Sequence, residues 1–334
     1  MAKRLTTFSK VLIALVSVLI LFFIIQKFMP LASNNTNSSN TANSNSEKTE
    51  TTHTTTVETK AKTKHTRKSF NYTPPKPVNG TLKGVVELGA SGFNSFIVNI
   101  DRNKNWELKK AEWGNSLVYD NMASSFDIRD GLKKYITNIL DYGVSGKNIH
   151  FVVSSGAQKV ASTRKIINEL RKMGYVVNTV TPEQEAKYAL KAVLPKRYKA
   201  SAFVVDIGSG NTKISWVENN GNIKGLETYG AKYYKNNIPD KKVYQDVYNK
   251  TKMVPSSRTE LCFMIGGVPF SLAKEIRNGK ERYTVLKDPS EYKAEKAKIK
   301  SGLNIYKAIK DASGCDLYVF DWDANFTIGF LLSL

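Results

Sequence analysis

The chain has 334 residues, 41% of them apolar, which is enough to bury a core of roughly two domains. Its formal net charge is +21, from 50 Lys and Arg against 29 Asp and Glu, and such a field attracts anions of many kinds. No zinc-finger, RNA-binding or basic-zipper pattern accompanies the charge, so we expect no specific nucleic-acid recognition. Cys262 and Cys315 lie in apolar runs, which predicts two buried thiols, with a single bridge as the alternative in an oxidising compartment.

The N-terminal segment has the pattern of a membrane anchor. Basic side chains within residues 1–10 precede an apolar run over 11–25, whose length lies between a signal-peptide core and a complete span. Gln26 and Lys27 interrupt the run, and the predicted anchor over 11–29 reaches nearly a full span by including Phe28 and Met29. A cleavage site after it is poor because Leu31 is not a small residue. We therefore expect an uncleaved, single-pass signal anchor, with a cleaved signal peptide as the alternative. The basic flank predicts a cytoplasmic N-terminus and an extracytoplasmic globular domain.

Residues 30–80 are rich in Asn, Ser, Thr and Lys, and we expect a disordered linker there because few of them can bury apolar surface. Beyond the linker, strand-like runs alternate with helical patterns, which is typical of an α/β fold. The strand-like runs are KGVVEL, SFIVNI, IHFVVSS, AFVVDIG, KISWVE, CFMIGG and DLYVFDW, and the helical stretches are 128–142, 157–173, 182–193 and 291–312.

Two segments of the chain share one pattern. KGVVELGASGFNSFIVNID (83–101) and AFVVDIGSGNTKISWVE (202–218) are each an apolar strand that ends in an acid, Glu87 or Asp206, followed by a glycine turn and a second strand. A glycine turn exposes backbone N–H groups to an anion, and a carboxylate at the strand end can hold a hydrated divalent cation. One such segment is most simply an ordinary hairpin. Two of them predict a duplicated fold whose hairpins clamp phosphates from both sides.

Over residues 84–334 the sequence resembles the exopolyphosphatase and guanosine pentaphosphate phosphohydrolase (Ppx/GppA) family of the actin-like ATPase superfamily. VVELGASGFNSFIV and VVDIGSGNTKI resemble the two phosphate loops of that family. Further matches, in chain order, are VVSSGAQKVA (152–161), VNTVTPEQEAKYAL (177–190), MIGGVPFSLAKEI (264–276) and the closing VFDWDANFTIGFLL. The resemblance implies a two-lobed actin-like, ribonuclease H-like duplicated fold, with lobe I over 81–200 and lobe II over 201–334.

The resemblance also implies an activity, the hydrolysis of phosphoanhydride bonds in polyphosphate or a nucleoside polyphosphate with Mg²⁺ or Mn²⁺. Glu185 would orient or deprotonate the attacking water, and Glu87 and Asp206 would hold the metal through water. The implied phosphate-binding residues are Gly89, Ser91, Gly92, Asn94, Ser95, Lys159, Gly208, Ser209, Gly210, Asn211 and Thr212, and Gly266 and Gly267 would approach the nucleoside or the rest of the chain. Without the resemblance, Glu183 and Glu185 read as acids at a helix N-terminus.

Several departures from the family pattern leave a different class of function open. Glu87 replaces an Asp, Lys159 an Arg and Pro182 a flexible Gly, and Thr327 stands where a closing Arg is expected. The alternative is a catalytically degraded actin-like module that binds a nucleotide or a partner in a cell-envelope assembly. Whether catalysis is retained and whether the chain forms a homodimer are left open. For the Tyr- and Lys-rich residues 229–250 we expect a solvated amphipathic helix with its approach loop, and a polyanion groove is the alternative.

Overall fold

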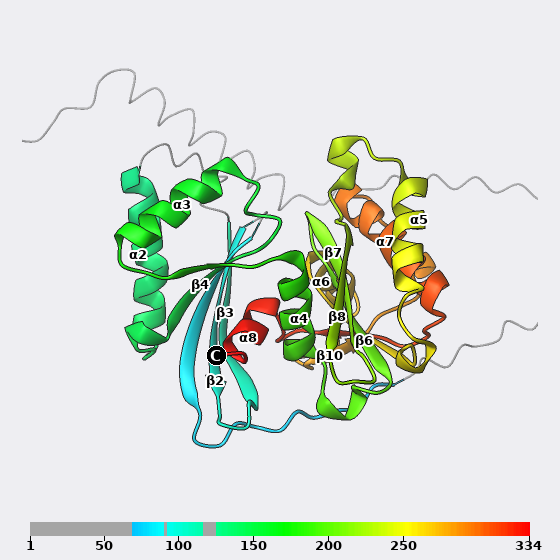
Figure 1. The fold of residues 1–334 in the computed structure, drawn as a ribbon, viewed down its shortest axis with the longest axis horizontal. Helices are drawn as coiled ribbons and strands as arrows, with labels where there is room; N and C mark the ends of the chain where they lie inside the picture. The colour runs from blue at the N-terminus through cyan, green and yellow to red at the C-terminus, as the bar shows by residue number, and fades with distance from the viewer. Residues whose placement is uncertain (1–68, 90–91, 116–124) are drawn as a thin grey trace, which may run out of the picture. The chain divides into compact units, whose positions relative to one another are not determined.

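The structure is a computed structural model that describes residues 69–89, 92–115 and 125–334, and it contains two β-sheets with helices packed around them (Figure 1). The strands of the first sheet are β1 (Thr81–Leu88), β2 (Gly92–Ile100), β3 (Trp106–Asn115), β4 (Ile149–Val153) and β5 (Val177–Thr179). Those of the second sheet are β6 (Ala202–Ile207), β7 (Asn211–Val217), β8 (Ile223–Tyr229), β9 (Leu261–Ile265), β10 (Tyr283–Val285) and β11 (Tyr318–Asp321).

The α-helices are α2 (Ser125–Asp141), α3 (Ala161–Lys172), α4 (Pro182–Val193), α5 (Asp240–Thr251), α6 (Gly267–Lys274), α7 (Ala297–Ser313) and α8 (Phe326–Leu331). Short 3₁₀ turns are η1 (Gly146–Asn148), η2 (Lys196–Tyr198), η3 (Tyr233–Asn236), η4 (Ser256–Arg258) and η5 (Pro289–Glu291). The helices expected from periodicity correspond to α2, α3, α4 and α7. Helix α4 begins where the sequence predicts, because Thr181 and Gln184 form a reciprocal capping box ahead of Pro182.

The two sheets have the same internal order, which confirms the duplicated two-lobed actin-like α/β fold. The strand order is β3-β2-β1-β4-β5 in the first sheet and β10-β11-β9-β6-β7-β8 in the second. In each sheet an antiparallel meander, β1–β2–β3 or β6–β7–β8, is followed by a strand parallel to the first one, β4 or β9. Parallel pairing needs a crossover connection, and α2 and α5 supply it.

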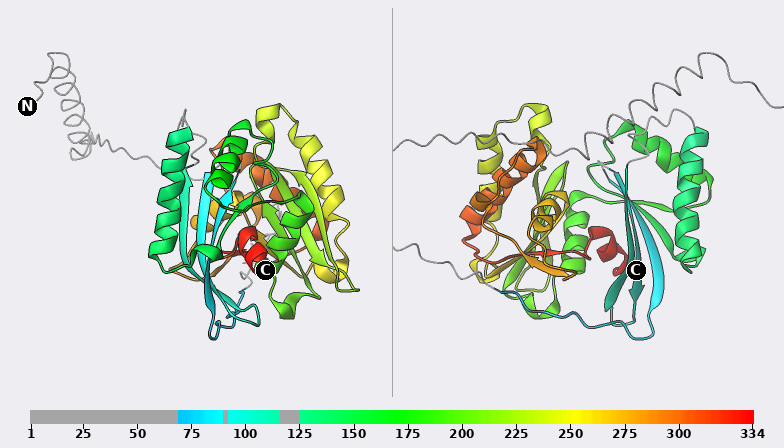
Figure 2. Two further views of the ribbon diagram at one scale, coloured as in Figure 1. Left: turned by 60° about the vertical axis from the view of Figure 1, so that its left-hand side comes forward. Right: turned by 180° about the vertical axis from the view of Figure 1, so that it is seen from behind.

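Three layers of apolar side chains hold the sheets and helices together. Helices α2 and α3 lie on the outer face of the first sheet, α5 and α7 lie on the outer face of the second, and α4 and α8 lie between the sheets (Figures 1 and 2). The central layer joins Val85 and Phe96 of the first sheet to Val204 and Phe263 of the second. Side chains alternate along a strand, so the residues next to Val85 on β1 and next to Val204 on β6 point the other way. They pack into the outer apolar layer of their own sheet.

The end of the predicted linker belongs to the globular unit. Phe70 packs against the rings of Tyr198, Phe263 and Tyr283 at centroid distances of 5.7, 5.5 and 5.2 Å. The backbone N–H of Val78 donates a hydrogen bond to Asp101 Oδ2 at 3.1 Å. Residues 69–80 of the predicted linker (30–80) are therefore ordered, because these aromatic contacts offset the cost of ordering the backbone, and residues 30–68 lie outside the described residues.

Other expectations have mixed outcomes. Cys262 and Cys315 are both buried free thiols, as expected. The segment 229–250 contains α5, which buries Val243 and Val247 and exposes most of its polar residues, as an amphipathic helix does. The anchor predicted over 11–29 lies outside the described residues, and none of the helices within those residues is both long and apolar enough to cross a membrane.

Candidate active site

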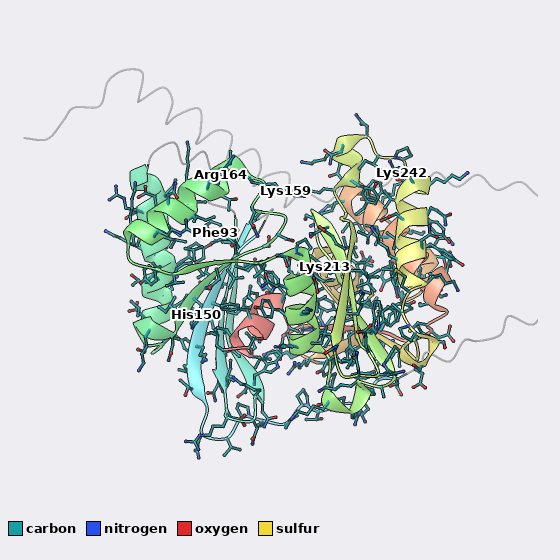
Figure 3. The ribbon with its side chains drawn as sticks, in the orientation of Figure 1. Phe93, His150, Lys159, Arg164, Lys213 and Lys242 are labelled. Carbon is teal, nitrogen blue, oxygen red and sulfur yellow. The ribbon has the colours of Figure 1, made fainter. Side chains whose placement is uncertain are left out.

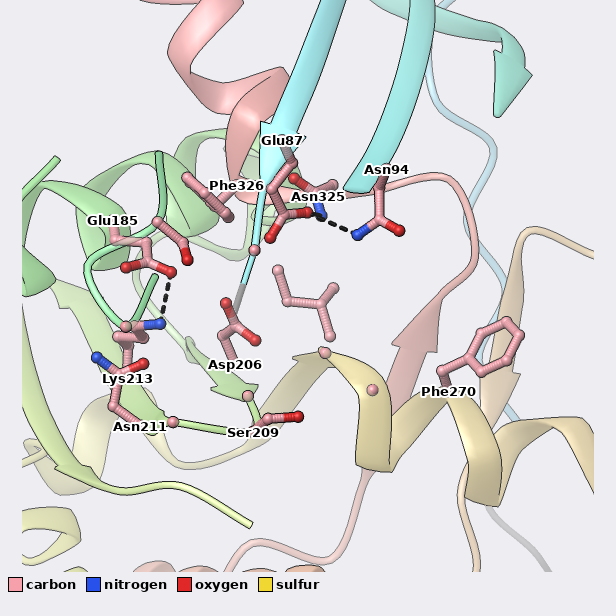
Figure 4. Close-up of a pocket in the computed structure, with 18 of the residues that line it drawn as sticks. Glu87, Asn94, Glu185, Asp206, Ser209, Asn211, Lys213, Phe270, Asn325 and Phe326 are labelled. Carbon is pink, nitrogen blue, oxygen red and sulfur yellow. Dashed lines mark hydrogen bonds and ion pairs between the residues drawn. The ribbon is translucent and has the colours of Figure 1, made fainter. Parts of the chain in front are cut away.

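A pocket of about 270 Å³ lies where the β1–β2 and β6–β7 hairpins meet. Its wall includes most of the predicted site residues: Glu87, Gly89, Asn94, Glu185, Asp206, Gly208, Ser209, Gly210, Asn211, Gly266 and Gly267. Figure 4 shows Glu87 and Asp206 on facing sides of the pocket, each at the end of its strand. The structure thus brings together the two acids that the duplicated sequence pattern singles out.

Three predicted phosphate-binding residues, Ser95, Thr212 and Lys159, are not part of this wall, and Ser91 lies outside the described residues. Ser95 and Thr212 are buried on strands where they alternate with the wall residues Asn94 and Asn211. Gly92 is the first residue of β2. The side chain of Lys159 is exposed on the stretch that leads into α3 (Figure 3), so in this structure the basic position of segment 152–161 does not reach the pocket.

Glu87 is held by two amides. Its Oε2 accepts hydrogen bonds from Asn94 Nδ2 at 2.9 Å and from Asn325 Nδ2 at 3.0 Å, although Asn325 lies 238 positions away in the sequence. Burial raises the pKa of Glu87 to about 7, with the carboxylates of Glu185 and Asp206 adding to the effect and the two amides opposing it. The side chain is therefore oriented through Oε2, and near neutral pH its protonated and ionised forms are both populated.

Asp206 ends β6 and lies against a glycine that accepts no side chain. Burial raises its pKa to about 6, Lys213 opposes this shift, and Glu185 adds to it. Gly266 has φ +98°, and a Cβ there would lie 2.5 Å from Asp206 Oδ1 and 2.6 Å from the carbonyl oxygen of Ile207. Only glycine allows the turn before α6 to approach the acid this closely.

The second glycine turn, residues 208–210, is held by hydrogen bonds of its flanking residues and has two backbone N–H groups available to a ligand. Gly208 N–H donates to the carbonyl of Asn211 at 3.0 Å, which closes the turn. Asn211 Nδ2 donates to Ser155 Oγ at 2.9 Å and to Glu227 Oε1 at 2.6 Å. Among the described residues, no protein acceptor faces the backbone N–H groups of Ser209 and Gly210. Such groups in a glycine turn are suited to bind phosphate oxygens.

Glu185, the predicted catalytic acid, is already paired. Its Oε1 accepts from Lys213 Nζ at 2.5 Å, and its Oε2 accepts from the backbone N–H of Ser155 at 3.1 Å and from the Ser155 hydroxyl. The side chains of Lys213 and Glu185 are 4% and 3% exposed, so the ion pair is buried. Although burial alone favours the neutral amine, the carboxylates of Glu185 and Asp206 raise the pKa of Lys213, which stays charged.

Sequence reasoning missed several wall residues, among them Lys213, Asn325 and Trp113. Lys213 is two residues after Asn211 on the same strand, and period-two alternation therefore places it on the same face. Asn325 caps α8 by accepting from Thr327 N–H at 2.8 Å, and an Asn before an apolar helix is a typical cap. No local pattern links either residue to Glu87 or Glu185.

The acids of the pocket fit a magnesium ion that keeps much of its water. Within residues 69–89, 92–115 and 125–334, no group of three or more His, Cys, Asp or Glu side chains is placed to hold a metal. Mg²⁺, however, is often held by one or two carboxylates with waters and substrate phosphates. Glu87 and Asp206 are two such carboxylates, and burial raises the pKa of both. Their oxygen chemistry suits Mg²⁺ and supplies no nitrogen or sulfur ligand.

No protein-family model and no curated protein sequence matches this chain. Solved structures do match it. A PPX-GPPA enzyme of Aquifex aeolicus has 17% sequence identity and a TM-score of 0.58, and the match covers 76% of this chain and 99% of that one. An exopolyphosphatase of Cytophaga hutchinsonii has 12% identity and a TM-score of 0.58, with 76% and 97% covered. The chain therefore has the actin-like ATPase fold of the Ppx/GppA exopolyphosphatases, as the resemblance in sequence implies.

Proposed function

We propose that the chain is a Mg²⁺-dependent phosphoanhydride hydrolase that removes the terminal phosphate of polyphosphate or a nucleoside polyphosphate. The observation that carries the proposal is the meeting of Glu87 and Asp206, from two equivalent hairpins, at one pocket edged by the glycine turn 208–210. The structural neighbours named exopolyphosphatases support the class of reaction. Phosphoryl transfer depends mainly on positioning and charge neutralisation, which this set of residues can provide.

In this proposal, metal binding, phosphate binding and proton transfer are carried out by different groups of the pocket. Glu87 and Asp206 would hold Mg²⁺, which neutralises phosphate charge when it is bound. The N–H groups of Ser209 and Gly210 bind phosphate oxygens. Glu185 accepts a proton from the water that attacks the terminal phosphorus, while the bond from phosphorus to the bridging oxygen breaks and its electrons leave with the shorter product. A phosphate oxygen that accepts from Lys213 would free Glu185 Oε1 for that water.

One observation favours a second candidate, a binding module without turnover. The buried Lys213 ammonium already neutralises Glu185, and both carboxylate oxygens hold donors. If the Lys213 ammonium does not move when phosphate binds, neither Glu185 oxygen is available to accept a proton from the attacking water. The pocket then binds a nucleotide or a polyphosphate and retains it, as a module in a cell-envelope assembly would.

We further propose that residues 11–29 anchor the chain in a membrane and that the following linker places the pocket outside the cytoplasm. The apolar run and its basic N-terminal flank support this. The physiological substrate is then a phosphoanhydride that is present outside the cytoplasm.

A phosphate-release assay with the full chain separates the two candidates. Polyphosphates and nucleoside triphosphates are offered with Mg²⁺ or Mn²⁺, and binding of each is measured in parallel. Release that Glu185→Gln abolishes while binding persists supports the hydrolase. Binding without release from any phosphoanhydride supports the module, and the absence of both contradicts the phosphate pocket itself.

A further inference from the structure

One end of the pocket is aromatic. Trp113 of β3, Phe270 of α6 and Trp322, just after β11, all line it. The Phe270 ring lies 5.8 Å from that of Trp113, tilted by 38°, and 5.4 Å from that of Trp322 in an edge contact. Figure 4 places Phe270 on the opposite side of Asp206 from Glu185. The pocket therefore runs from the charged Glu185–Lys213 pair to an aromatic wall.

The aromatic wall is only partly explained by packing. Phe270 also contacts Phe320, and the guanidinium of Arg277 covers a face of Trp322 at 3.8 Å. Trp113 packs edge-on against Phe96 at 5.3 Å and is still 56% exposed, although it is the residue through which the first sheet reaches the wall. A large apolar ring left open at the edge of a polar pocket is a common feature of ligand sites.

A lysine without an anion lies next to the wall. Lys298 in the first turn of α7 lines the pocket, and its Nζ lies 3.1 Å from the point where a Cβ on Gly267 would stand. In the described part of the chain Lys298 has no carboxylate partner, and burial together with the nearby Lys232 lowers its pKa. A half-buried ammonium of this kind is stabilised when a ligand brings a negative group to it.

We propose that this end of the pocket binds a nucleobase, so that the ligand is a nucleoside polyphosphate and not an inorganic polyphosphate. The base stacks on Trp113 and Phe270, the phosphate closest to the nucleoside contacts Lys298, and the terminal phosphate lies at the Glu185 end. The inference rests on the proposed function, because it assumes that phosphates occupy the pocket.

The chemistry of the wall discriminates between the two ligands. The face of an aromatic ring carries partial negative charge, so a polyphosphate chain is not attracted to it, whereas every nucleobase has a π-face that stacks well there. An inorganic chain also gains nothing from a wall of three aromatic side chains at a distance from the reacting end. The order of aromatic wall, unpaired cation and acidic centre matches the order of base, inner phosphate and terminal phosphate.

The test compares ATP with tripolyphosphate, which have the same number of phosphates, by calorimetric titration of the full chain with Mg²⁺. We expect Trp113→Leu to weaken ATP binding on the order of 5- to 150-fold, the range that base stacking contributes, and to leave tripolyphosphate binding unchanged. Trp113→Phe keeps a stacking face and should bind ATP nearly as the natural chain does. Lys298→Met should weaken both ligands. Tyr142→Leu, at an exposed aromatic outside the pocket, should change neither.

Three results would overturn the inference. If Trp113→Leu weakens the binding of ATP and of tripolyphosphate equally, the ring has only a structural role in holding the two sheets together. Unchanged ATP binding in Trp113→Leu, with thermal unfolding like that of the natural chain, means that no base lies there. Both results leave the phosphate pocket intact, and with it the proposed function. Failure of the natural chain to bind either ligand contradicts the proposed function as well.

Discussion

Lys213 Nζ lies 2.5 Å from Glu185 Oε1 in a buried ion pair between the second strand of the β6–β7 hairpin and the first turn of α4. Both residues of the pair line the pocket, and the nearby Asp206 carboxylate also stabilises the charged form of Lys213. It fixes the orientation of the acid on which the proposed hydrolysis depends. It also makes the reactivity of that acid conditional on where the ammonium goes when phosphate arrives.

Breaking this pair from one side should be costly. Lys213→Met leaves the Glu185 carboxylate buried without its counter-charge, and we expect a loss of about 3–5 kcal/mol in the free energy of unfolding. Combining Lys213→Met with Glu185→Gln removes both charges, so the double variant should lose much less than the sum of the single losses. Urea unfolding followed by tryptophan fluorescence measures the cycle. Additive losses, or a single-variant loss below about 1 kcal/mol, would show that the pair is not coupled.

The stability of the folded chain should depend on pH through Glu87. Its pKa is raised to about 7 in the folded state from an ordinary value of 4.5, so the unfolded chain ionises first as pH rises. The contribution of Glu87 to the free energy of unfolding is fully present below pH 4.5, falls as pH rises to about 7, and is then constant. The total loss is up to about 3 kcal/mol. Glu87→Gln can still accept from Asn94 and Asn325 and should remove most of this loss.

Unfolding of both chains between pH 4 and 8, with a chelator present, checks the contribution of Glu87. Asp206, whose pKa is raised to about 6, adds a smaller loss of the same sign that remains in Glu87→Gln. Adding Mg²⁺ above pH 7 should stabilise the natural chain more than the variant, because the variant lacks one of the two carboxylates. Identical pH profiles for the two chains would rule out Glu87 as the source.

Two neighbouring glycines should respond differently to the same substitution. In Gly266→Ala the new Cβ meets Asp206 Oδ1 at 2.5 Å and the backbone of Ile207 at 2.6 Å, and the residue has φ +98°, so we expect a loss of folding or of phosphate binding. In Gly267→Ala the Cβ meets only the flexible end of Lys298 at 3.1 Å. That variant should fold normally and bind phosphate up to about tenfold more weakly. Thermal unfolding and tripolyphosphate titration compare the two, and similar behaviour would contradict the close approach at Gly266.

The N-terminal segment should hold the chain in the membrane. Deleting residues 1–30 removes the predicted anchor, and the shortened chain should move from the membrane fraction to the soluble fraction after alkaline carbonate extraction. A reporter fused after Leu334 should be active only outside the cytoplasm. Activity only in the cytoplasm would reverse the predicted topology.

The sequence predicts the two hairpins well, because glycine turns behind β-branched runs are local signals and the repetition of Glu87 and Asp206 is visible without structure. It does not predict the partners of those acids. Asn325 reaches Glu87 only because α8 returns to β1, and that contact depends on tertiary packing. The position of Lys159 shows the opposite limit, since a matched position in a motif does not fix the direction of a side chain.

Lys213 shows why site chemistry is harder to predict than fold. On β7 it reads as one polar residue in an alternating strand, and a lysine there is most simply a solvated one. Only the fold brings Glu185 of α4 to Lys213, and the carboxylates of Glu185, Asp206 and Glu87 offset the electrostatic cost of burying the lysine. Long-range compensation of this kind leaves no periodic trace in the sequence.

The clamp itself is tested most directly by a crystal structure of the chain with Mg²⁺ and a non-hydrolysable imidotriphosphate. We expect terminal phosphate oxygens at about 2.7–3.2 Å from the N–H groups of Ser209 and Gly210, with the Mg²⁺ shell contacting Glu87 and Asp206. A phosphate chain bound only to surface lysines, with the space between Glu87 and Asp206 empty, would contradict it.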